Sequence, residues 1–451
     1  MTEFLQKVKY GIIIGMLAGI MLLLSGCFMR GTEELYCVPK RSNAYLNLQE
    51  MVETAIGEGE YCAPISGDNR QAIQQADLDG DGKDEYIVYA RTGEEKPLKI
   101  FVFQNSGDSF ILRHTLEGEG SAFDRVYYEQ IDGVGGMELV VGRRVSDQVP
   151  QALTVYSFRT EEIAELVSTN YTDYTVCDVD ADGLSDLFVI RSDTEQRNAV
   201  AEMYRWQNGE LVRENEADLS APSENYKRTV IGSLSDGTPA FFVASSYGEN
   251  SIITDVLALS GGAFRNITLS DESGTSTSTV RNYYVYSADI DGDGITEIPN
   301  TELLPSVSYD AQTENQYLII WSSVSPDGSR IEKLRTYHNY ADGWYLTLPK
   351  GWTGNLVVSR RVQGISMGYV FYKLNAEGKT ERFLSIYEIS GETSADDLNS
   401  GNGTLLATWN GVSYVAFADR GGPAAAISQE ELQAMFHSIV TEPAAGENNP
   451  G

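Results

Sequence analysis

Short runs of β-branched and aromatic residues recur along most of the chain and are separated by turn-forming residues. The first unit contains four such runs, at residues 86–90, 99–104, 110–115 and 125–130, with glycine- and asparagine-containing turns between them. Runs of this length and composition predict β-strands. Four strands in about fifty residues predict one four-stranded antiparallel sheet per unit.

An acidic loop recurs at the start of these units. Three copies, at 77–85, 178–186 and 289–297, share the full pattern D-x-D-x-D-G-x-x-[DE], and copies at 130–138 and 232–237 keep only part of it. The first positions of successive copies lie 48 to 57 residues apart, a period typical of β-propeller blades. We therefore expect a mainly β protein, a propeller of about five to seven four-stranded blades.

The spacing of oxygen atoms in the complete loops predicts calcium binding. Carboxylates at positions 1, 3 and 5 converge on one point, glycine at position 6 permits the turn, and position 7 offers its backbone carbonyl. Position 12, which carries a bidentate glutamate in an EF-hand, holds Val88, Val189 or Asn300, so these loops are not EF-hands. An empty acidic turn is the weaker interpretation, because carboxylates this close repel one another. With position 9 closing the shell, the expected ligands of about three structural calcium ions are Asp77, Asp79, Asp81, Lys83, Glu85, Asp178, Asp180, Asp182, Leu184, Asp186, Asp289, Asp291, Asp293, Ile295 and Glu297.

This pattern resembles the FG-GAP or VCBS repeat of integrin-alpha-like β-propellers, in which a D-x-D-x-D-G-x-x-D loop between two strands of a blade binds calcium. The resemblance covers most of a predicted propeller domain at 70–339. It implies calcium-stabilised blades that recognise a protein or a carbohydrate. In the partial copies Gln130, Val134, Gly232 and Leu234 replace acidic positions of the family, so we expect no calcium there.

Beyond residue 339 the acidic loop does not recur. A terminal helix is expected to begin at Ser428, with Leu432, Met435, Phe436 and Ile439 on one face. Further strands are expected at 356–358, 369–372, 383–387 and 412–417. We interpret residues 340–440 as a small α+β domain; the alternative is that these strands form the final blades. In a closed ring, a strand at 73–76 would complete the last blade by pairing the two ends, and residues 441–451 are expected to be a disordered tail.

The amino terminus is typical of a bacterial export signal, with Lys7 and Lys9 before an uncharged apolar stretch at 11–24. The tetrad Leu-Ser-Gly-Cys that ends at Cys27 resembles the lipobox of bacterial lipoproteins, in which the cysteine is acylated, typically carries palmitate, and becomes the first mature residue. We expect a signal peptide at 1–26 and a lipidated linker with a short helix at 27–69. The alternative is an uncleaved signal anchor. Both place the remaining chain on the extracytoplasmic face of the cell membrane.

Three cysteines remain once Cys27 is acylated, and an odd number cannot all pair within one molecule. Cys37 and Cys62 flank a segment with helical spacing of apolar residues at 43–56, and a disulfide between them would fix this segment to the chain that follows. Two free thiols are the alternative.

Composition excludes several classes of function. A net charge of -32 excludes binding to nucleic acid, and the three histidines are too far apart in sequence to suggest a zinc site. The stretch at 364–368 matches a nucleophile elbow, but it leads into a predicted strand instead of a helix, so we assign no catalytic residue. We expect a membrane-anchored binding protein and not an enzyme. The alternatives are a secreted polysaccharide hydrolase or lyase on a propeller scaffold, and an envelope assembly factor whose C-terminal domain docks a partner.

Overall fold

The computed structural model describes residues 43–107, 109–145, 151–193, 198–305, 315–363, 366–390 and 403–439. The predicted signal peptide, Cys27, Cys37 and the tail at 441–451 lie outside the described residues. None of the helices in the described ranges is long and apolar enough to cross a membrane.

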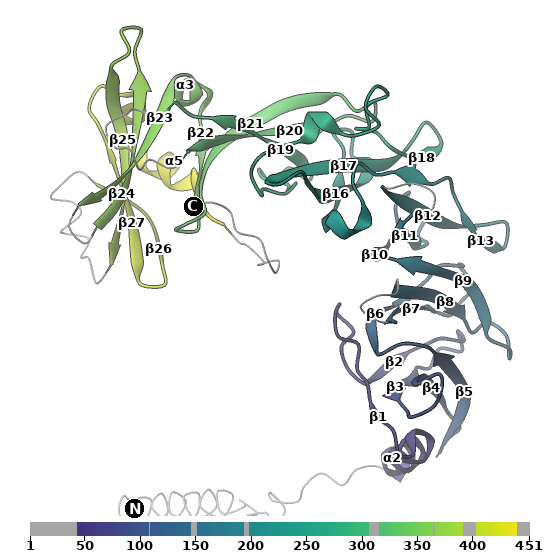
Figure 1. The fold of residues 1–451 in the computed structure, drawn as a ribbon. Helices are drawn as coiled ribbons and strands as arrows, with labels where there is room; N and C mark the ends of the chain where they lie inside the picture. Colours follow the sequence, from purple (N-terminus) through teal and green to yellow (C-terminus); the bar gives the residue numbers. More distant parts are fainter. Residues whose placement is uncertain are drawn as a thin grey trace, which may run out of the picture.

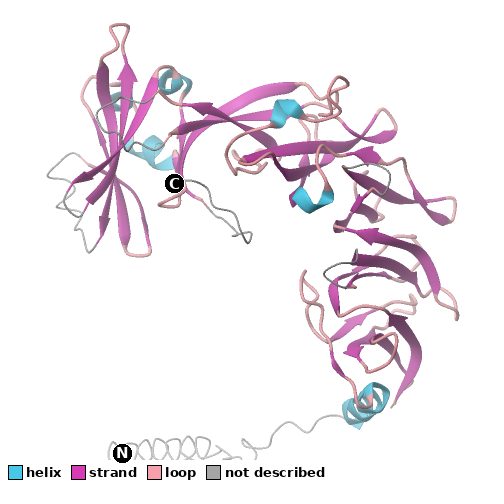
Figure 2. Cartoon of the chain, in the orientation of Figure 1, coloured by secondary structure: helices cyan, strands magenta, loops and turns pink. Residues whose placement is uncertain are grey.

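The described chain is mainly β and forms six antiparallel sheets that follow one another in sequence (Figure 2). The first contains β1 (Glu60–Tyr61), β2 (Ile73–Ala76), β3 (Glu85–Arg91), β4 (Leu98–Asn105) and β5 (Phe110–Gly118), and the second β6 (Ala122–Glu129), β7 (Glu138–Arg144), β8 (Gln151–Ser157) and β9 (Ala164–Tyr171). The third contains β10 (Asp173–Cys177), β11 (Asp186–Ser192), β12 (Ala199–Gln207), β13 (Glu210–Arg213) and β14 (Ala217–Asp218), and the fourth β15 (Tyr226–Ser233), β16 (Pro239–Tyr247), β17 (Ser251–Ser260) and β18 (Ala263–Asn266). The fifth contains β19 (Glu297–Leu303), β20 (Tyr317–Val324), β21 (Arg330–Asn339), β22 (Trp344–Leu348) and β28 (Phe436–Ser438), and the sixth β23 (Leu356–Gln363), β24 (Ser366–Leu374), β25 (Thr380–Ser390), β26 (Thr404–Trp409) and β27 (Val412–Ala418).

The six sheets lie along an open arc, with the first and the sixth at opposite ends (Figure 1). The strand expected at 73–76 forms as β2, but it pairs with β3 in the first sheet. The prediction that this strand pairs the two ends of the chain is therefore wrong, because the loop that follows β2 is short and returns the chain directly along it. The structure confirms a mainly β protein built from antiparallel sheets of the four-stranded type, four of which carry a fifth strand among the described residues, whereas ring closure and the number of blades stay predictions.

The core of the protein lies between successive sheets. Tyr89 of the first sheet meets Phe123 of the second edge to face, with ring centroids 5.0 Å apart, and Phe188 of the third stacks on Phe241 of the fourth at 4.0 Å. Each neighbouring pair of sheets shares one such buried cluster. Burying one large apolar side chain is worth about 1.5–3 kcal/mol, so these clusters hold each sheet to the next.

Helix α2 (Asn43–Ile56) forms where the apolar spacing predicted it. Leu48, Val52 and Ile56 are buried against the first sheet. Cys62, just after this helix, is half-buried, and its expected partner Cys37 lies outside the described residues. The disulfide between them stays a prediction.

The C-terminal helix is shorter than expected. α5 (Gln429–Ala434) begins after Ser428, whose side chain accepts from the Glu431 N–H while the Glu431 carboxylate accepts from the Ser428 N–H. The chain then forms β28, so Phe436 lies on a strand, where it is buried and stacks on Trp409 at 5.3 Å. The burial and stacking of Phe436 on this strand outweigh the helical spacing of the apolar residues, which predicted a longer helix. The other helices are α3 (Lys350–Thr353) and the 3-10 turns Ser223–Asn225, Thr277–Thr279 and Pro423–Ala426.

The fifth sheet crosses the domain boundary expected at residue 340. β21 ends at Asn339, whereas β22 and β28 lie beyond that boundary and pair into the same sheet. A buried cluster that includes Trp344 and Phe371 then joins the fifth sheet to the sixth. The division into domains stays a prediction.

Candidate metal centres

Each acidic loop leads directly into a strand of its sheet. We name the loops after their sheets: first loop (77–85), second loop (130–138), third loop (178–186), fourth loop (232–237) and fifth loop (289–297). The first four connect two paired neighbouring strands, β2 to β3, β6 to β7, β10 to β11 and β15 to β16. The fifth runs from Ala288, which bridges to Glu297, into β19.

Three acids converge in each complete loop, from positions 1, 3 and 9. Their oxygen atoms lie within 4.8 Å of one another, and the groups are Asp77 with Asp79 and Glu85, Asp178 with Asp180 and Asp186, and Asp289 with Asp291 and Glu297. The position 5 acids accept a hydrogen bond from the position 7 N–H at 2.8 Å in each loop, with the pairs Asp81 and Lys83, Asp182 and Leu184, and Asp293 and Ile295. A role for the position 5 carboxylates and the position 7 carbonyls as ligands stays a prediction.

The backbone of each complete loop folds around the acid at position 1. In the fifth loop, Asp289 Oδ1 accepts from the N–H groups of Gly292 and Asp293 at 2.8 and 3.0 Å, and Oδ2 accepts from Gly294 at 2.9 Å. Gly292 and Gly294 have φ values of 76° and 85°, a conformation that glycine adopts without steric cost. These bonds fix the loop in the shape that brings the acids together.

The acid at position 9 is buried in all three complete loops. Glu85, Asp186 and Glu297 each accept a hydrogen bond from the N–H of position 2, at 2.9, 3.1 and 3.2 Å. Glu297 is 0% exposed, and its Oε1 atom has no hydrogen-bond partner. A buried carboxylate oxygen without a partner is costly, so this loop requires either a proton or a cation.

The electrostatics of the loops lead to the same requirement. Burial, followed by repulsion from Asp79, Asp81 and Asp77, raises the pKa of Glu85 to about 7. Burial and the neighbouring acids of their own loops raise the pKa of Glu297 to about 7 and that of Asp186 to about 6. A divalent cation would replace the proton that these acids retain without metal.

Neighbouring loops are joined by backbone hydrogen bonds that the sequence did not predict. Met137 N–H donates to the Asp77 carbonyl at 2.9 Å, which joins the second loop to the first, and Ser185 N–H donates to the Gln130 carbonyl at 2.8 Å, which joins the third loop to the second. Thr296 N–H of the fifth loop donates to the carbonyl of Ser233 in the fourth at 2.9 Å. An ion in one loop would therefore also act on the joint with the next sheet.

The second loop is neutralised by an arginine. Asp132 is buried, and its Oδ2 lies 3.2 Å from Nη1 of Arg159, whose guanidinium lies over the ring of Trp206. Glu138 is also buried and accepts from the Ile131 N–H at 2.9 Å. A side chain of the protein thus supplies the positive charge in this loop. In the fourth loop Asp236 accepts from the N–H of Thr238, at 3.0 Å.

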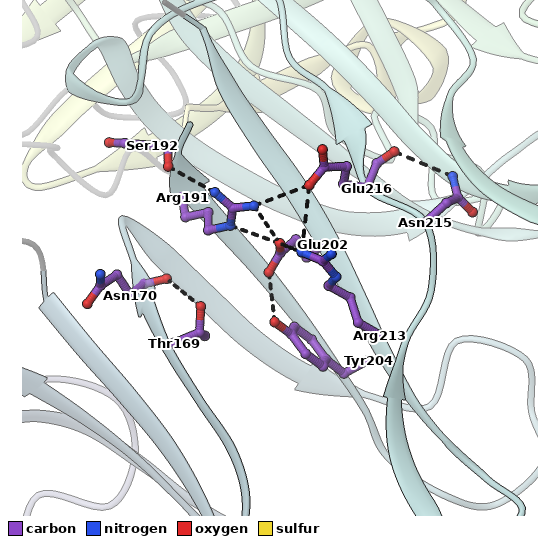
Figure 3. A network of polar contacts seen from close by, with 9 residues as sticks. All are labelled: Thr169, Asn170, Arg191, Ser192, Glu202, Tyr204, Arg213, Asn215 and Glu216. Carbon is purple, nitrogen blue, oxygen red and sulfur yellow. Dashed lines mark hydrogen bonds and ion pairs between the residues drawn. The ribbon is translucent and has the colours of Figure 1, made fainter. Parts of the chain in front are cut away.

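A separate group of buried charges lies in the third sheet (Figure 3). Glu202 on β12 is 1% exposed and accepts from Arg191 Nε at 2.8 Å, Arg213 Nη1 at 2.6 Å and the Tyr204 hydroxyl at 2.8 Å. Burial alone would raise the pKa of Glu202, but these hydrogen bonds outweigh it and lower the pKa. Because its carboxylate is satisfied within the protein, we interpret this network as structural.

An acid pair lies at the junction of the fifth and sixth sheets. Asp342, in the turn between β21 and β22, accepts from the Tyr369 hydroxyl at 2.6 Å and from Asn339 Nδ2 at 2.7 Å. Burial, and then the neighbouring Asp342, raises the pKa of Glu388 on β25 to about 7, and Glu388 Oε1 has no hydrogen-bond partner. No sequence pattern pointed to this pair, since the two acids are far apart in the chain and belong to no motif.

The stretch at 364–368 that matches a nucleophile elbow leads into β24, as predicted. A nucleophile elbow requires a helix at this point. The structure therefore gives no support to a catalytic triad there.

No family model matches the chain, and no curated protein matches it. Solved structures that match include the exotype rhamnogalacturonan lyase YesX, with 12% identity and a TM-score of 0.29 over 70% of this chain and 76% of the lyase. A thermostable family-43 glycoside hydrolase matches with 13% identity and a TM-score of 0.23, over 62% of this chain and 93% of its own. An endo-1,5-alpha-L-arabinanase from Thermotoga petrophila RKU-1 matches with 12% identity and a TM-score of 0.20, over 80% of this chain and 99% of its own.

These matches bear on one expectation from the sequence. The three solved structures named above are enzymes, which contradicts the prediction that the protein is not an enzyme, and that prediction is withdrawn. At these TM-scores the likeness assigns no substrate and no activity to this chain.

Proposed function

We propose that the chain is a calcium-binding lipoprotein of the FG-GAP or VCBS type, anchored through Cys27 on the extracytoplasmic face of the membrane. Calcium at the first, third and fifth loops would stabilise the joints between sheets and hold rigid a surface that recognises a protein or a carbohydrate. The observation that carries the calcium proposal is the buried carboxylate of Glu297, whose Oε1 has no hydrogen-bond partner and which forms one group with Asp289 and Asp291.

The size of the calcium effect follows from linkage. A ligand that binds only the folded state stabilises it by RT ln(1 + [L]/Kd). With ~2 mM calcium and a Kd of ~0.1–1 mM, typical of extracellular modules, each site contributes ~0.6–1.8 kcal/mol. Three occupied sites would raise the melting temperature by several degrees.

The experiment is a thermal melt of the chain from residue 28 onward, in ~2 mM calcium and in excess chelator. Glu297→Gln keeps the size of the side chain but removes its charge, and it should reduce the calcium-dependent rise in melting temperature. Asp236→Ala in the fourth loop is the matched control and should leave that rise unchanged. Identical melts with calcium and with chelator would refute the proposal.

A second candidate function rests on the acid pair at the sheet junction. Glu388, which retains a proton near neutral pH, lies beside Asp342, and this combination of acid and base supports general acid–base chemistry. The candidate reaction class is cleavage of a polysaccharide by hydrolysis or elimination.

The test is an assay of wild type and Glu388→Gln against a panel of neutral and acidic polysaccharides. New reducing ends would report hydrolysis, and unsaturated ends would report elimination. Cleavage that Glu388→Gln abolishes supports this candidate. No cleavage of any polymer, or equal cleavage by the variant, would refute it.

A further inference from the structure

The three complete loops differ in the residue that faces the position 9 acid across the sheet. In the first sheet Tyr86 pairs with Phe103, which places Gln104 beside Glu85. In the fifth sheet Glu297 pairs with Ser323. The third sheet has the same register as the first: Leu187 pairs with Tyr204, which places Arg205 beside Asp186. Only the third of these loops thus has a permanent positive charge at this position.

Arg205 contacts two of the three acids that form the third-loop group. Its Nη2 forms an ion pair with Asp180, and its Nε lies 3.5 Å from Asp186 Oδ1. The Arg205 side chain is 20% exposed, so water screens these contacts only in part. In the first loop the corresponding contact is a neutral one, from Gln104 Nε2 to Asp79 Oδ2 at 2.7 Å.

The fifth loop also has a cation nearby, but at a different acid. Lys333 Nζ lies 2.7 Å from Asp293 Oδ2 at position 5. Asp293 is not among the three acids whose oxygens converge, which are Asp289, Asp291 and Glu297. Lys333 therefore pairs with Asp293 and acts on the converging acid Glu297 only through its charge, whereas Arg205 contacts two converging acids directly.

The second loop shows the limiting case within the same chain. There Arg159 pairs with Asp132, and the loop lacks the acids at positions 1 and 5. The third loop is intermediate in its charges: it keeps all its acids, as the first and fifth loops do, but an arginine contacts them, as in the second loop. It also holds Ala181 at a φ of 59°, where the first and fifth loops have Gly80 and Gly292 at 76°, and a non-glycine residue adopts this conformation only at a cost.

We propose that Arg205 is a built-in competitor for calcium, so that the third loop binds calcium at least about tenfold more weakly than the first and fifth loops. This inference rests on the proposed function of the loops as calcium sites. A calcium ion must displace the guanidinium from Asp180 and Asp186 or bind beside it, and two positive charges about 5 Å apart repel one another even in a watery dielectric. A factor of ten corresponds to ~1.4 kcal/mol.

Because the third loop is expected to bind calcium most weakly, the joint between the second and third sheets should respond to calcium differently from the other joints. The third loop contacts the second through Ser185, whose N–H donates to the Gln130 carbonyl and whose Oγ donates to Glu129 Oε2 at 3.0 Å. As calcium falls, the third loop releases its ion first, while the first and fifth loops remain loaded. The joint between the second and third sheets then loses its ion before the other joints.

The experiment is a calorimetric calcium titration of the full-length chain in detergent. Wild type should show two tighter sites and one weaker site. Arg205→Gln, which copies the residue of the first sheet, should tighten the weaker site about tenfold and leave the other two unchanged. Lys333→Gln is the matched control and should change the weaker site less than twofold.

A reciprocal variant tests the inference even if Arg205→Gln fails to fold. Gln104→Arg places a guanidinium in the first loop and should convert one of the two tighter sites into a second weak site. Three equal sites, unaffected by either Arg205→Gln or Gln104→Arg, would overturn the inference and leave calcium binding standing. Absence of any calcium binding would overturn both proposals.

Discussion

Removal of the built-in cation of the second loop gives a direct test of how these loops are neutralised. In Arg159→Met the side chain keeps much of its apolar stem over Trp206 but loses its charge. Asp132, whose side chain is 1% exposed, and the buried Glu138 then remain as two acids without a counterion. Burial, followed by the charge of Asp132, already raises the pKa of Glu138.

The magnitude follows from burial and geometry. Removing one partner of a buried ion pair costs ~3–5 kcal/mol. Arg159 is 39% exposed, and its contact with Asp132 Oδ2 is not aligned as a hydrogen bond, so the lower end of this range applies. We expect a loss of about 3 kcal/mol in the free energy of unfolding.

The assay is chemical denaturation of wild type, Arg159→Met, Asp132→Asn and the double variant at neutral pH in excess chelator. In the double variant the uncompensated charge is absent, so it should recover at least about half of the loss seen in Arg159→Met. A loss below ~1 kcal/mol in Arg159→Met, or a double variant no more stable than Arg159→Met, would refute the reasoning.

Three further predictions concern other parts of the protein. Glu202→Gln should destabilise the third sheet by ~2–3 kcal/mol, because hydrogen bonds to a charged acceptor are lost, and a shift in the denaturation midpoint measures it; an unchanged midpoint would contradict the role given to this network. For Glu388 the folded pKa of about 7 lies above the ordinary 4.5, so its contribution to stability is complete below pH 4.5 and is lost as the pH rises through 7. Glu388→Gln should therefore lose less melting temperature than wild type between pH 5 and pH 8, and an equal loss would count against this assignment. Ser428→Ala removes the cap of α5 and should cost ~1 kcal/mol by the same denaturation assay, with the exposed Ser106→Ala as the control.

The sequence predicts those parts of the fold that local patterns determine. The strands of the first sheet, helix α2 and the Ser428 cap all depend on residues a few positions apart, as does the position of each acidic loop before its strand. The contact of Arg205 with Asp186 depends instead on the register between β11 and β12, and no pattern of residues close together in the sequence predicts that register. The pair of Asp342 and Glu388 requires two sheets to meet, and the path of the sheets along an arc depends on how side chains such as Phe188 and Phe241 fit together.

The backbone bonds between loops also determine how the molecule would respond to a mechanical load. Counted from Gly232, position 8 of the fourth loop is Pro239, which has no N–H, so the bond that joins the other neighbouring loops cannot form between the third and fourth sheets. That joint is held instead by side chains: Asn266 Nδ2 donates to the Asp218 carbonyl at 3.0 Å, the Tyr226 hydroxyl donates to Asp173, and Phe188 stacks on Phe241. Because each sheet contacts mainly its neighbours, tension along the chain is carried in series. We expect side chains to carry the load at this joint, whereas the joints on either side also use a backbone bond between loops.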